Sequence, residues 1–130
     1  MTPSDLDTLA RLVYGEARNQ SYQGMKAVAH VVLNRVAKGS PDHTIVKAAT
    51  RHKQFSCFDA NDPNFKLTQT VSLADNLFQC CMNAALEAIR EPDFTKGATH
   101  YHTHAVSPSW SKGKTPCLII EDHKFFNNID

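Results

Sequence analysis

The sequence predicts an α+β domain that is mainly helical and carries a small antiparallel β element. Three long segments, residues 5–17, 23–38 and 72–90, have apolar residues at helical spacing. After Pro92 the pattern changes to two short runs rich in β-branched and aromatic residues, ATHYH (residues 98–102) and CLIIE (residues 117–121). With 130 residues and no linker, repeat or low-complexity tract, the chain is expected to form one domain over residues 1–130.

The first helix is predicted over residues 5–17. Ser4 and Asp7 have the spacing of a capping box, in which two side chains bond the free backbone N–H groups of the first turn. When residues are placed at intervals of about 100°, Glu16 falls beside Leu9 at the margin of the apolar stripe. Glu16 is therefore expected to line the edge of a cleft.

The second helix, over residues 23–38, is apolar on nearly every side and is predicted to lie at the centre of the domain. Gly39 and Pro41 are expected to end it. Asn34 and Arg35 interrupt its apolar surface, and each therefore needs a polar partner. They are expected either to bridge buried loop carbonyls or to face the predicted cleft.

The middle of the chain is predicted to hold a short third helix at residues 42–49, a structured loop at residues 52–70 and a long fourth helix. The loop is expected to contain a short strand at residues 54–58. The fourth helix is expected to begin at Ser72, with Asp75 completing a capping box. Its buried side is predicted to consist of Leu73, Leu77, Cys80, Cys81, Ala84, Leu86, Ala88 and Ile89.

The two β-prone runs after Pro92 are predicted to pair with each other. Within HYHTH, alternation places His100, His102 and His104 on one face of a strand, with His123 opposite. Three imidazoles on one face are a possible zinc site, although no HExxH motif is present. The alternative is that these histidines have structural roles.

Composition excludes several classes of function. The net charge is +1, with 14 basic and 13 acidic residues mixed along the chain, which argues against a general nucleic-acid or anionic-membrane binder. Acidic residues stand where a signal peptide needs basic ones, and no apolar run is long enough to span a membrane. The chain is therefore expected to be made in the cytoplasm without a signal peptide. The four cysteines, Cys57, Cys80, Cys81 and Cys117, are predicted to be reduced core thiols.

Glu16 is the first candidate for chemistry. A carboxylic acid half-buried against apolar neighbours keeps its proton more readily, which suits a general acid near neutral pH. The alternative is a solvated helix-end acid paired with Arg18. Trp110 is a candidate for stacking on a sugar ring or, equally, for anchoring a core. Cys57 or Cys117 as a nucleophile is less favoured, because both lie in apolar stretches that stabilise a thiolate poorly.

Four segments in order, LARLVYGEAR, GMKAVAHVVLNRV, QFSCF and GATHYH…SPSW…HKFF, resemble the SleB/CwlJ-like cell wall hydrolase family of spore cortex-lytic enzymes and related phage endolysins. The resemblance implies a lysozyme-like α+β domain that cleaves the bond between N-acetylmuramic acid and N-acetylglucosamine without a metal or cofactor. It implies that Glu16 is the catalytic acid. The predicted substrate-binding residues are Gln54, Phe55, Ser56, Thr99, His100 and Tyr101, to which Trp110 is added for stacking.

For the reaction we expect attack by the C6 hydroxyl of muramic acid, which would need only one carboxylate. A hydrolytic muramidase would need a second, and Asp59 and Asp62 are the candidates. The competing functions are a zinc-dependent peptidoglycan amidase using His100, His102 and His104, and a non-catalytic glycan-binding module. The expected role is that of a monomeric phage endolysin that binds peptidoglycan glycan strands and acts on the cell wall after release.

Overall fold

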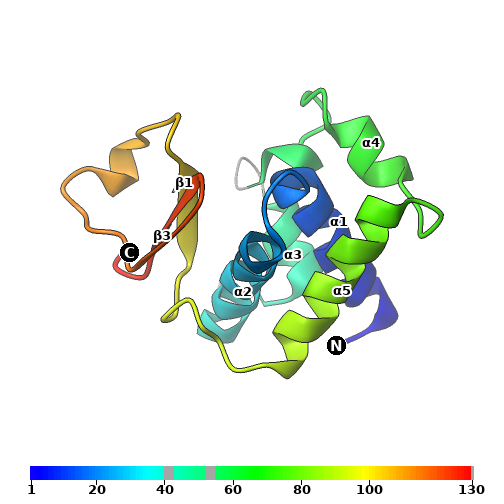
Figure 1. The fold of residues 1–130 in the computed structure, drawn as a ribbon, viewed down its shortest axis with the longest axis horizontal. Helices are drawn as coiled ribbons and strands as arrows, with labels where there is room; N and C mark the ends of the chain where they lie inside the picture. Colours follow the sequence, from blue (N-terminus) through cyan, green and yellow to red (C-terminus); the bar gives the residue numbers. More distant parts are fainter. Residues whose placement is uncertain (40–42, 52–54, 130) are drawn as a thin grey trace.

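The computed structural model describes residues 1–39, 43–51 and 55–129 of the chain, and its helices and strands form separate parts (Figure 1). The α-helices are α1 (Pro3–Ala17), α2 (Tyr22–Lys38), α3 (Ile45–Thr50), α4 (Phe65–Thr70) and α5 (Asn76–Arg90). Short 3-10 helices are η1 (Ser56–Phe58) and η2 (Ser109–Ser111), and the strands are β1 (His100–Thr103), β2 (Leu118–Ile120) and β3 (His123–Phe126). The prediction of a mainly helical α+β fold is confirmed.

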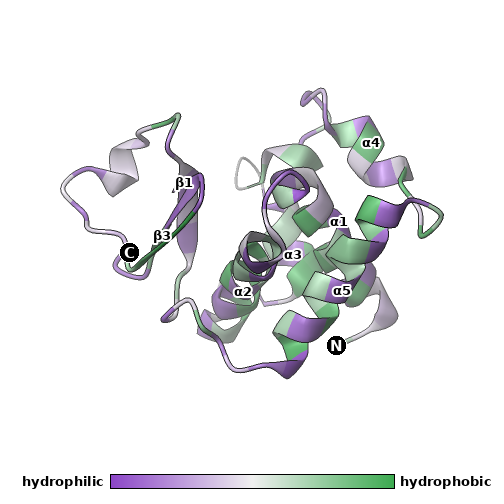
Figure 2. Ribbon diagram, viewed as in Figure 1, coloured by the Kyte–Doolittle hydropathy of each residue, from purple (hydrophilic) through white to green (hydrophobic). Residues whose placement is uncertain are grey.

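Helices α1, α2 and α5 pack against one another and form the apolar core. In Figure 2, where apolar residues are green, these helices carry much of the green colour. Helix α2 is buried on most sides, as predicted, because its small and β-branched residues let the neighbouring helices approach closely. No helix among the described residues is both long enough and apolar enough to cross a bilayer.

Helix α1 begins two residues earlier than the sequence predicts. Thr2 caps it by accepting a hydrogen bond from Asp5 N, and Asp5 accepts one from Thr2 N, so the capping box is Thr2–Asp5 and not Ser4–Asp7. Pro3 explains the shift, because proline is favoured in the first helical turn and has no N–H to leave unpaired.

Of the other two long helices, α2 ends where the sequence predicts and α5 does not begin where it predicts. Helix α2 ends at Gly39 as expected, because this glycine adopts a positive φ of 98° that other residues avoid. Helix α5 begins later than predicted, and Asp75 is its N-cap, accepting from Phe78 N. Leu73 therefore lies before the helix and is 54% exposed, so its predicted burial is wrong. Leu77, Cys80 and Ile89 are exposed as well.

The predicted loop between the third and fourth helices is more helical than its sequence indicates. Part of the third helix prediction, residue 42, lies outside the described residues, and α3 begins at Ile45 with Thr44 as its cap. The predicted strand at residues 54–58 is wrong, because residues 56–58 form η1. Helix α4 was not predicted; the Arg11 guanidinium donates to the carbonyls at its end, those of Thr68, Gln69 and Val71.

The sheet has three strands in the order β1-β3-β2, all antiparallel. The two runs that the sequence predicts to pair do not contact each other as neighbours. Each pairs with β3, in a register that places Tyr101 opposite Phe125 and Leu118 also opposite Phe125. A tight turn at Glu121, with φ 46°, lets the chain reverse after β2 and run back between the other two strands.

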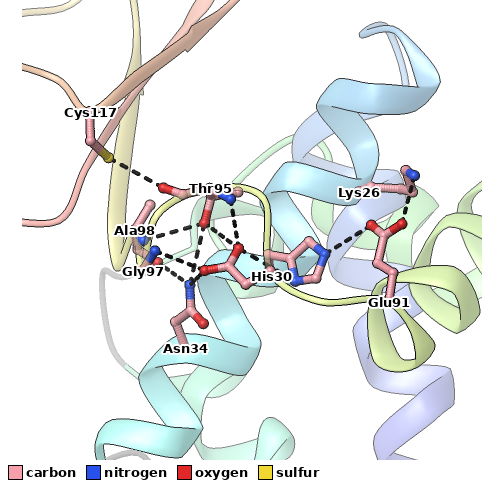
Figure 3. Close-up of polar contacts among 9 residues, drawn as sticks. Lys26, His30, Asn34, Glu91, Thr95, Gly97, Ala98 and Cys117 are labelled. Carbon is pink, nitrogen blue, oxygen red and sulfur yellow. Dashed lines mark hydrogen bonds and ion pairs between the residues drawn. The ribbon is translucent and has the colours of Figure 1, made fainter.

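Polar contacts connect α2 to the segment that leads from α5 into β1 (Figure 3). We call this group the polar junction; it consists of Lys26, His30, Asn34, Glu91, Asp93 and Thr95. Lys26 Nζ donates to Glu91 at 2.9 Å, and buried His30 Nε2 lies 3.0 Å from the same carboxylate. Asn34 Nδ2 donates to Ala98 O at 2.9 Å.

The polar junction fixes the start of β1 relative to α2. Beside it, Arg35 Nε donates to Thr99 O at 2.6 Å. Both polar residues that interrupt α2 therefore bridge loop carbonyls, which is the first of the two alternatives left by the sequence. Because these carbonyls directly precede β1, the two side chains determine where that strand lies against the helices.

Candidate active site

Glu16 lies in the last turn of α1 and is half-buried at the side of a cleft. The cleft has a volume of about 410 Å³ and separates the end of α1 from the sheet. Its walls are formed by Glu16, Asn19, Gln20, Thr103, His104, Ala105, Asp122 and His123. This position agrees with the helical wheel, which places Glu16 at the margin of the buried stripe.

Two hydroxyl groups from distant parts of the chain contact the Glu16 carboxylate. The Tyr101 hydroxyl on β1 donates to Oε1 at 2.8 Å, and the Ser56 hydroxyl on η1 donates to Oε2 at 3.4 Å. Burial and the adjacent carboxylate raise the pKa of Tyr101 well above its usual range, so its phenol remains a proton donor at neutral pH. Three elements thus converge on one carboxylate.

The Tyr101 ring is held by aromatic neighbours on the inner face of the sheet. Its centroid lies 5.1 Å from that of His123 in an edge-on arrangement and 5.8 Å from that of Phe125. The centroid of the Phe55 ring lies 6.4 Å from that of Tyr101, and the Arg35 guanidinium lies 5.0 Å from the centroid of the Phe55 ring. Phe55 therefore packs behind Tyr101, where it supports the hydroxyl that contacts Glu16.

The end of α1 packs tightly against the segment that carries Ser56. A Cβ atom added to Gly15 would overlap the Cys57 side chain and lie 2.8 Å from Thr68 Oγ1, so only glycine allows this approach. Asn64 Nδ2 also donates to Gly15 O at 2.8 Å. Glycine at this position thereby brings the Ser56 hydroxyl to the neighbouring Glu16.

Arg18 has a different role from the one that the alternative interpretation gave it. Its guanidinium donates to Tyr14 O at 3.1 Å and to Asn64 Oδ1 at 2.8 Å, and it lies 4.7 Å above the Tyr14 ring. The structure describes both Arg18 and Glu16 and records no ion pair between them. Arg18 instead fixes the loop before α4 to the end of α1.

Asp59 and Asp62, the candidates for a second catalytic carboxylate, form hydrogen bonds within the loop that contains them. Asp59 accepts a hydrogen bond from Asn61 N, and Asp62 accepts one from Asn64 N. Neither lines the cleft that contains Glu16, whereas Asp122 does. The sequence analysis missed Asp122; the signal for it was its place in a Glu–Asp pair at the end of the β-prone run CLIIE.

The three histidines of HYHTH do not share one face, so that prediction is wrong. Strand β1 ends at Thr103, and His104 lies in the following turn, where it lines the cleft with Nε2 3.0 Å from Glu121 O. His100 and His102 point to the outer face, where both pack against Trp110. Among the described residues, no three histidine, cysteine or acidic side chains are arranged to hold a metal ion.

The other predicted substrate-binding residues lie in different places. Thr99 is buried beside Arg35, and its hydroxyl lies 3.0 Å from His100 Nδ1. Trp110 is half-buried on the outer face of the sheet, with its ring 5.3 Å from that of Phe126. Gln54 lies outside the described residues. Of the predicted residues that the structure describes, only Ser56 and Tyr101 form hydrogen bonds with Glu16.

Two residues of the cleft wall have polar atoms without a partner in the described part of the chain. They are the buried atoms Gln20 Oε1 and His123 Nδ1. Burial lowers the pKa of His123, so its imidazole is neutral at physiological pH. His123 therefore contributes a neutral ring, and not a cation, to the wall of the cleft.

Cys57 and Cys117, the two candidate cysteine nucleophiles, are poorly suited to that role. Burial and the nearby Glu16 carboxylate raise the pKa of Cys57 strongly, and burial also raises the pKa of Cys117. Both thiols therefore stay protonated at neutral pH, and a protonated thiol is a poor nucleophile. All four cysteines are free, but Cys80 is exposed, which differs from the predicted core position.

Comparisons with known proteins give one family. The model of the Cell Wall Hydrolase family matches residues 19–126, beginning three residues after Glu16. A spore cortex-lytic enzyme of Bacillus cereus is 32% identical over 98 residues, which is 75% of this chain and 34% of that protein. A spore cortex-lytic enzyme of Halalkalibacterium halodurans is 28% identical over 125 residues, 95% of this chain and 35% of that protein. The chain thus spans about a third of the length of these relatives.

Solved structures with a similar fold agree with this result. The catalytic domain of the Bacillus cereus SleB protein superposes with a TM-score of 0.81 at 26% identity, covering 97% of this chain and 91% of that one. The catalytic domain of the germination-specific lytic transglycosylase SleB from Bacillus anthracis gives a TM-score of 0.77 at 27% identity, covering 97% and 96%. Because these matches cover 97% of the chain, they include most of α1, which lies entirely before the residues matched by the family model.

Proposed function

The chain belongs to the Cell Wall Hydrolase family, and on that premise we propose that it cleaves the glycan strands of peptidoglycan between N-acetylmuramic acid and N-acetylglucosamine, with Glu16 as the general acid. One observation carries the proposal. A half-buried carboxylate beside a cleft of about 410 Å³ accepts hydrogen bonds from two hydroxyl groups of separate elements. The likeness to two catalytic domains of SleB over 97% of the chain supports it.

The contacts suit a carboxylic acid that must present its proton in one direction. Because the Tyr101 hydroxyl donates to Oε1, the transferable proton belongs on Oε2, where the longer Ser56 contact is easily given up. Protonation of the glycosidic oxygen by a positioned acid typically contributes about 10²–10⁴-fold to the rate. Tyr101 itself holds the carboxyl group in place and does not exchange its proton.

For the second half of the reaction we propose attack by the C6 hydroxyl of the same muramic acid. The C1–O4 bond breaks as Glu16 protonates O4, the C1–O6 bond forms, and the O6 proton returns to the Glu16 carboxylate. No water is consumed, and the product is a 1,6-anhydro end. A positioned intramolecular hydroxyl has a large effective concentration, so one carboxylate suffices. The lytic transglycosylase named among the similar structures supports this route.

Hydrolysis is the second candidate, because Asp122 lines the same cleft as Glu16. A second carboxylate is what a hydrolytic glycosidase ordinarily uses as nucleophile or base. In that case Asp122 would activate water or attack C1, and the new end would be a free reducing sugar.

Product analysis tests the proposal. Purified peptidoglycan is digested, half of the soluble fragments are treated with borohydride, and both halves are analysed by mass spectrometry. We expect muramic acid ends lighter by one water and unchanged by borohydride. Reducible ends as the main product would favour hydrolysis and make Asp122→Asn the next variant, whereas cleavage only of the peptide would contradict a glycosidase.

The proposed biological role is lysis of bacterial cell walls by an endolysin-type enzyme that acts as a monomer outside the cytoplasm. The substrate supports this, because peptidoglycan lies outside the cell membrane. Added externally to bacteria with permeabilised outer membranes, the protein should clear the suspension. A Glu16→Gln protein added at the same concentration is the matched control and should leave the suspension turbid.

A further inference from the structure

The outer face of the sheet carries a second hollow, which the proposed chemistry does not use. It has a volume of about 420 Å³ and lies between the sheet and the loop that contains η2. Its floor includes His102 of β1 and Phe126 of β3, whose rings stack at 5.2 Å. Three lysines line it, Lys112, Lys114 and Lys124, and we call it the lysine pocket.

The lysine pocket has an unbalanced positive charge. No acidic residue lines it, and none of its three lysines forms an ion pair with a carboxylate in the described part of the chain. Lysine side chains are cations at neutral pH, and like charges gathered at one hollow repel each other unless an anion lies between them. The chain as a whole is nearly neutral, with a net charge of +1, so this concentration of charge is local.

The lysine pocket and the Glu16 cleft are neighbours along one loop. Ala105 lines the cleft and Ser107 lines the pocket, so only Val106 separates them. Two successive Cα–Cα steps span at most about 7.6 Å. Val106 is 52% exposed, so it lies at the surface between the two hollows.

The two hollows differ in charge. The cleft wall contains the carboxylates of Glu16 and Asp122, whereas the pocket contains three ammonium groups. A ligand with a neutral glycan part and an anionic branch would therefore place the glycan in the cleft and the branch in the pocket. Strand β1 is at the edge of the sheet, and its alternate side chains face the two hollows, Thr103 the cleft and His102 the pocket.

We propose that the lysine pocket binds the carboxylates of the peptide stems that peptidoglycan carries on its muramic acid residues. This inference rests on the proposed function, because that function places the muramic acid in the cleft. An extended stem of three to five residues reaches roughly 10–17 Å, enough to pass Val106 and enter the pocket. The stacked His102 and Phe126 rings offer an apolar surface for the aliphatic parts of the stem.

Binding is measured on the Glu16→Gln protein, so that the ligand is not cleaved. The probes are a disaccharide carrying a tetrapeptide stem, the same compound with its carboxylates amidated, and the disaccharide alone. We expect the acidic compound to bind at least about fivefold more tightly than the other two, with the difference shrinking as salt is raised. Equal binding of all three would overturn the proposal.

The matched variants remove three cations each. The pocket variant, which should lose the preference for the acidic compound, is Lys112→Gln/Lys114→Gln/Lys124→Gln. The control variant, which should keep the preference, carries Lys47→Gln/Lys66→Gln/Arg90→Gln at exposed positions on α3, α4 and α5. Circular dichroism establishes that both variants are folded. Loss of the preference in both variants, or tighter binding of a glycerol phosphate oligomer than of the acidic stem at the lysine pocket, would contradict a carboxylate site.

Activity separates this inference from the proposed function. With Glu16 present, the pocket variant should cleave intact peptidoglycan at least about threefold more slowly than the control variant and cleave glycan without stems at the same rate. Equal rates on both substrates would refute the lysine pocket alone. Absence of glycan cleavage by the unaltered protein, together with stem-dependent binding, would refute the glycosidase and leave the pocket.

Discussion

The two side chains that meet at the site, Glu16 and Tyr101, belong to regions held together by different forces. Glu16 ends α1, which packs into an apolar core with α2 and α5. Tyr101 is on the sheet, whose approach to the helices is determined by the polar junction (Figure 3) and also by Arg35. The core depends on buried area, which is not directional, whereas the junction depends on the geometry of individual hydrogen bonds.

This difference explains how the site combines stability with placement. An apolar core of α1, α2 and α5 keeps the carboxylate on a rigid helix, and directional hydrogen bonds bring the hydroxyl on β1 to it at 2.8 Å. The two regions should therefore respond differently to substitution and to pH. Four changes test this, taken from the largest expected effect to the smallest.

Glu16→Gln should abolish function while leaving both regions folded. The amide keeps the size of the side chain but has no transferable proton, so cleavage of purified peptidoglycan should fall about 10²–10⁴-fold. Release of soluble fragments gives the rate, and thermal unfolding gives the stability, which should be unchanged. Near-normal cleavage by the folded variant would show that a group other than Glu16 is the catalytic acid.

Gly15→Ala should damage the helical side of the site. The added methyl group would overlap Cys57 and crowd Thr68, which should cost about 3 kcal/mol in unfolding free energy, the upper end for overpacking. Chemical denaturation measures the loss. Gly24→Ala is the matched control, because the nearest atom to its new Cβ would be a side-chain carbon of Gln20 at 3.1 Å and alanine favours the helix. A loss no larger than that of the control would contradict the tight approach.

Asp93→Ala should loosen the polar junction and leave the apolar core intact. The carboxylate accepts hydrogen bonds from Thr95, Gly97 and Asn34, and losing them should cost about 2 kcal/mol. Hydrogen exchange should quicken at the amide of Ala98 and stay unchanged at Val31 in the core. Equal quickening at both amides would show that the two regions unfold as one unit.

Asp93 also determines how the stability of the polar junction depends on pH. Burial alone would raise the pKa of Asp93, but the hydrogen bonds it accepts outweigh burial and lower the pKa below its ordinary 3.8. A lowered pKa in the folded state stabilises the junction above about pH 4 and loses that contribution as the pH falls below it. The protection factor of the Ala98 amide, which corrects for the pH dependence of the intrinsic exchange rate, should therefore fall in acid in the unaltered protein and respond less in Asp93→Ala.

Tyr101→Phe should have the smallest effect, because it removes one hydrogen bond and keeps the ring. A hydrogen bond of this kind contributes about 0.5–1.5 kcal/mol, so cleavage should slow by roughly 2–12-fold. The control is thermal unfolding, which should show that the variant is folded. A rate equal to that of the unaltered protein would contradict a role for this hydrogen bond in holding the carboxyl group.

Local patterns were sufficient for most of the helical part. The spacing of apolar residues predicted α1, α2 and α5, and it placed Glu16 at the edge of the buried stripe. The boundaries were less accurate. Ser4 and Ser72 are residue types that often cap helices, but the side chains that cap α1 and α5 in the structure are those of Thr2 and Asp75. Several residues can form a cap, and the one that does so is selected by how the whole helix packs.

Nonlocal contacts explain the failures. Helix α4 lies in a polar segment and depends on Arg11, more than fifty positions away, to bond its final carbonyls. The β-prone runs were recognised, but their pairing was wrong because β3 inserts between them. The alternation of HYHTH predicted one shared face, whereas the strand ends before His104.

The sequence by itself determined the class of fold, the family resemblance and the identity of the candidate acid, since each can be read from short segments of the chain and their order. Only the tertiary structure decided which groups surround that acid. Tyr101 and Ser56 are 85 and 40 positions from Glu16, and Asp122 lines the same cleft from a turn of the sheet. Such contacts depend on how the elements pack together, and spacing along the chain carries no measure of that packing.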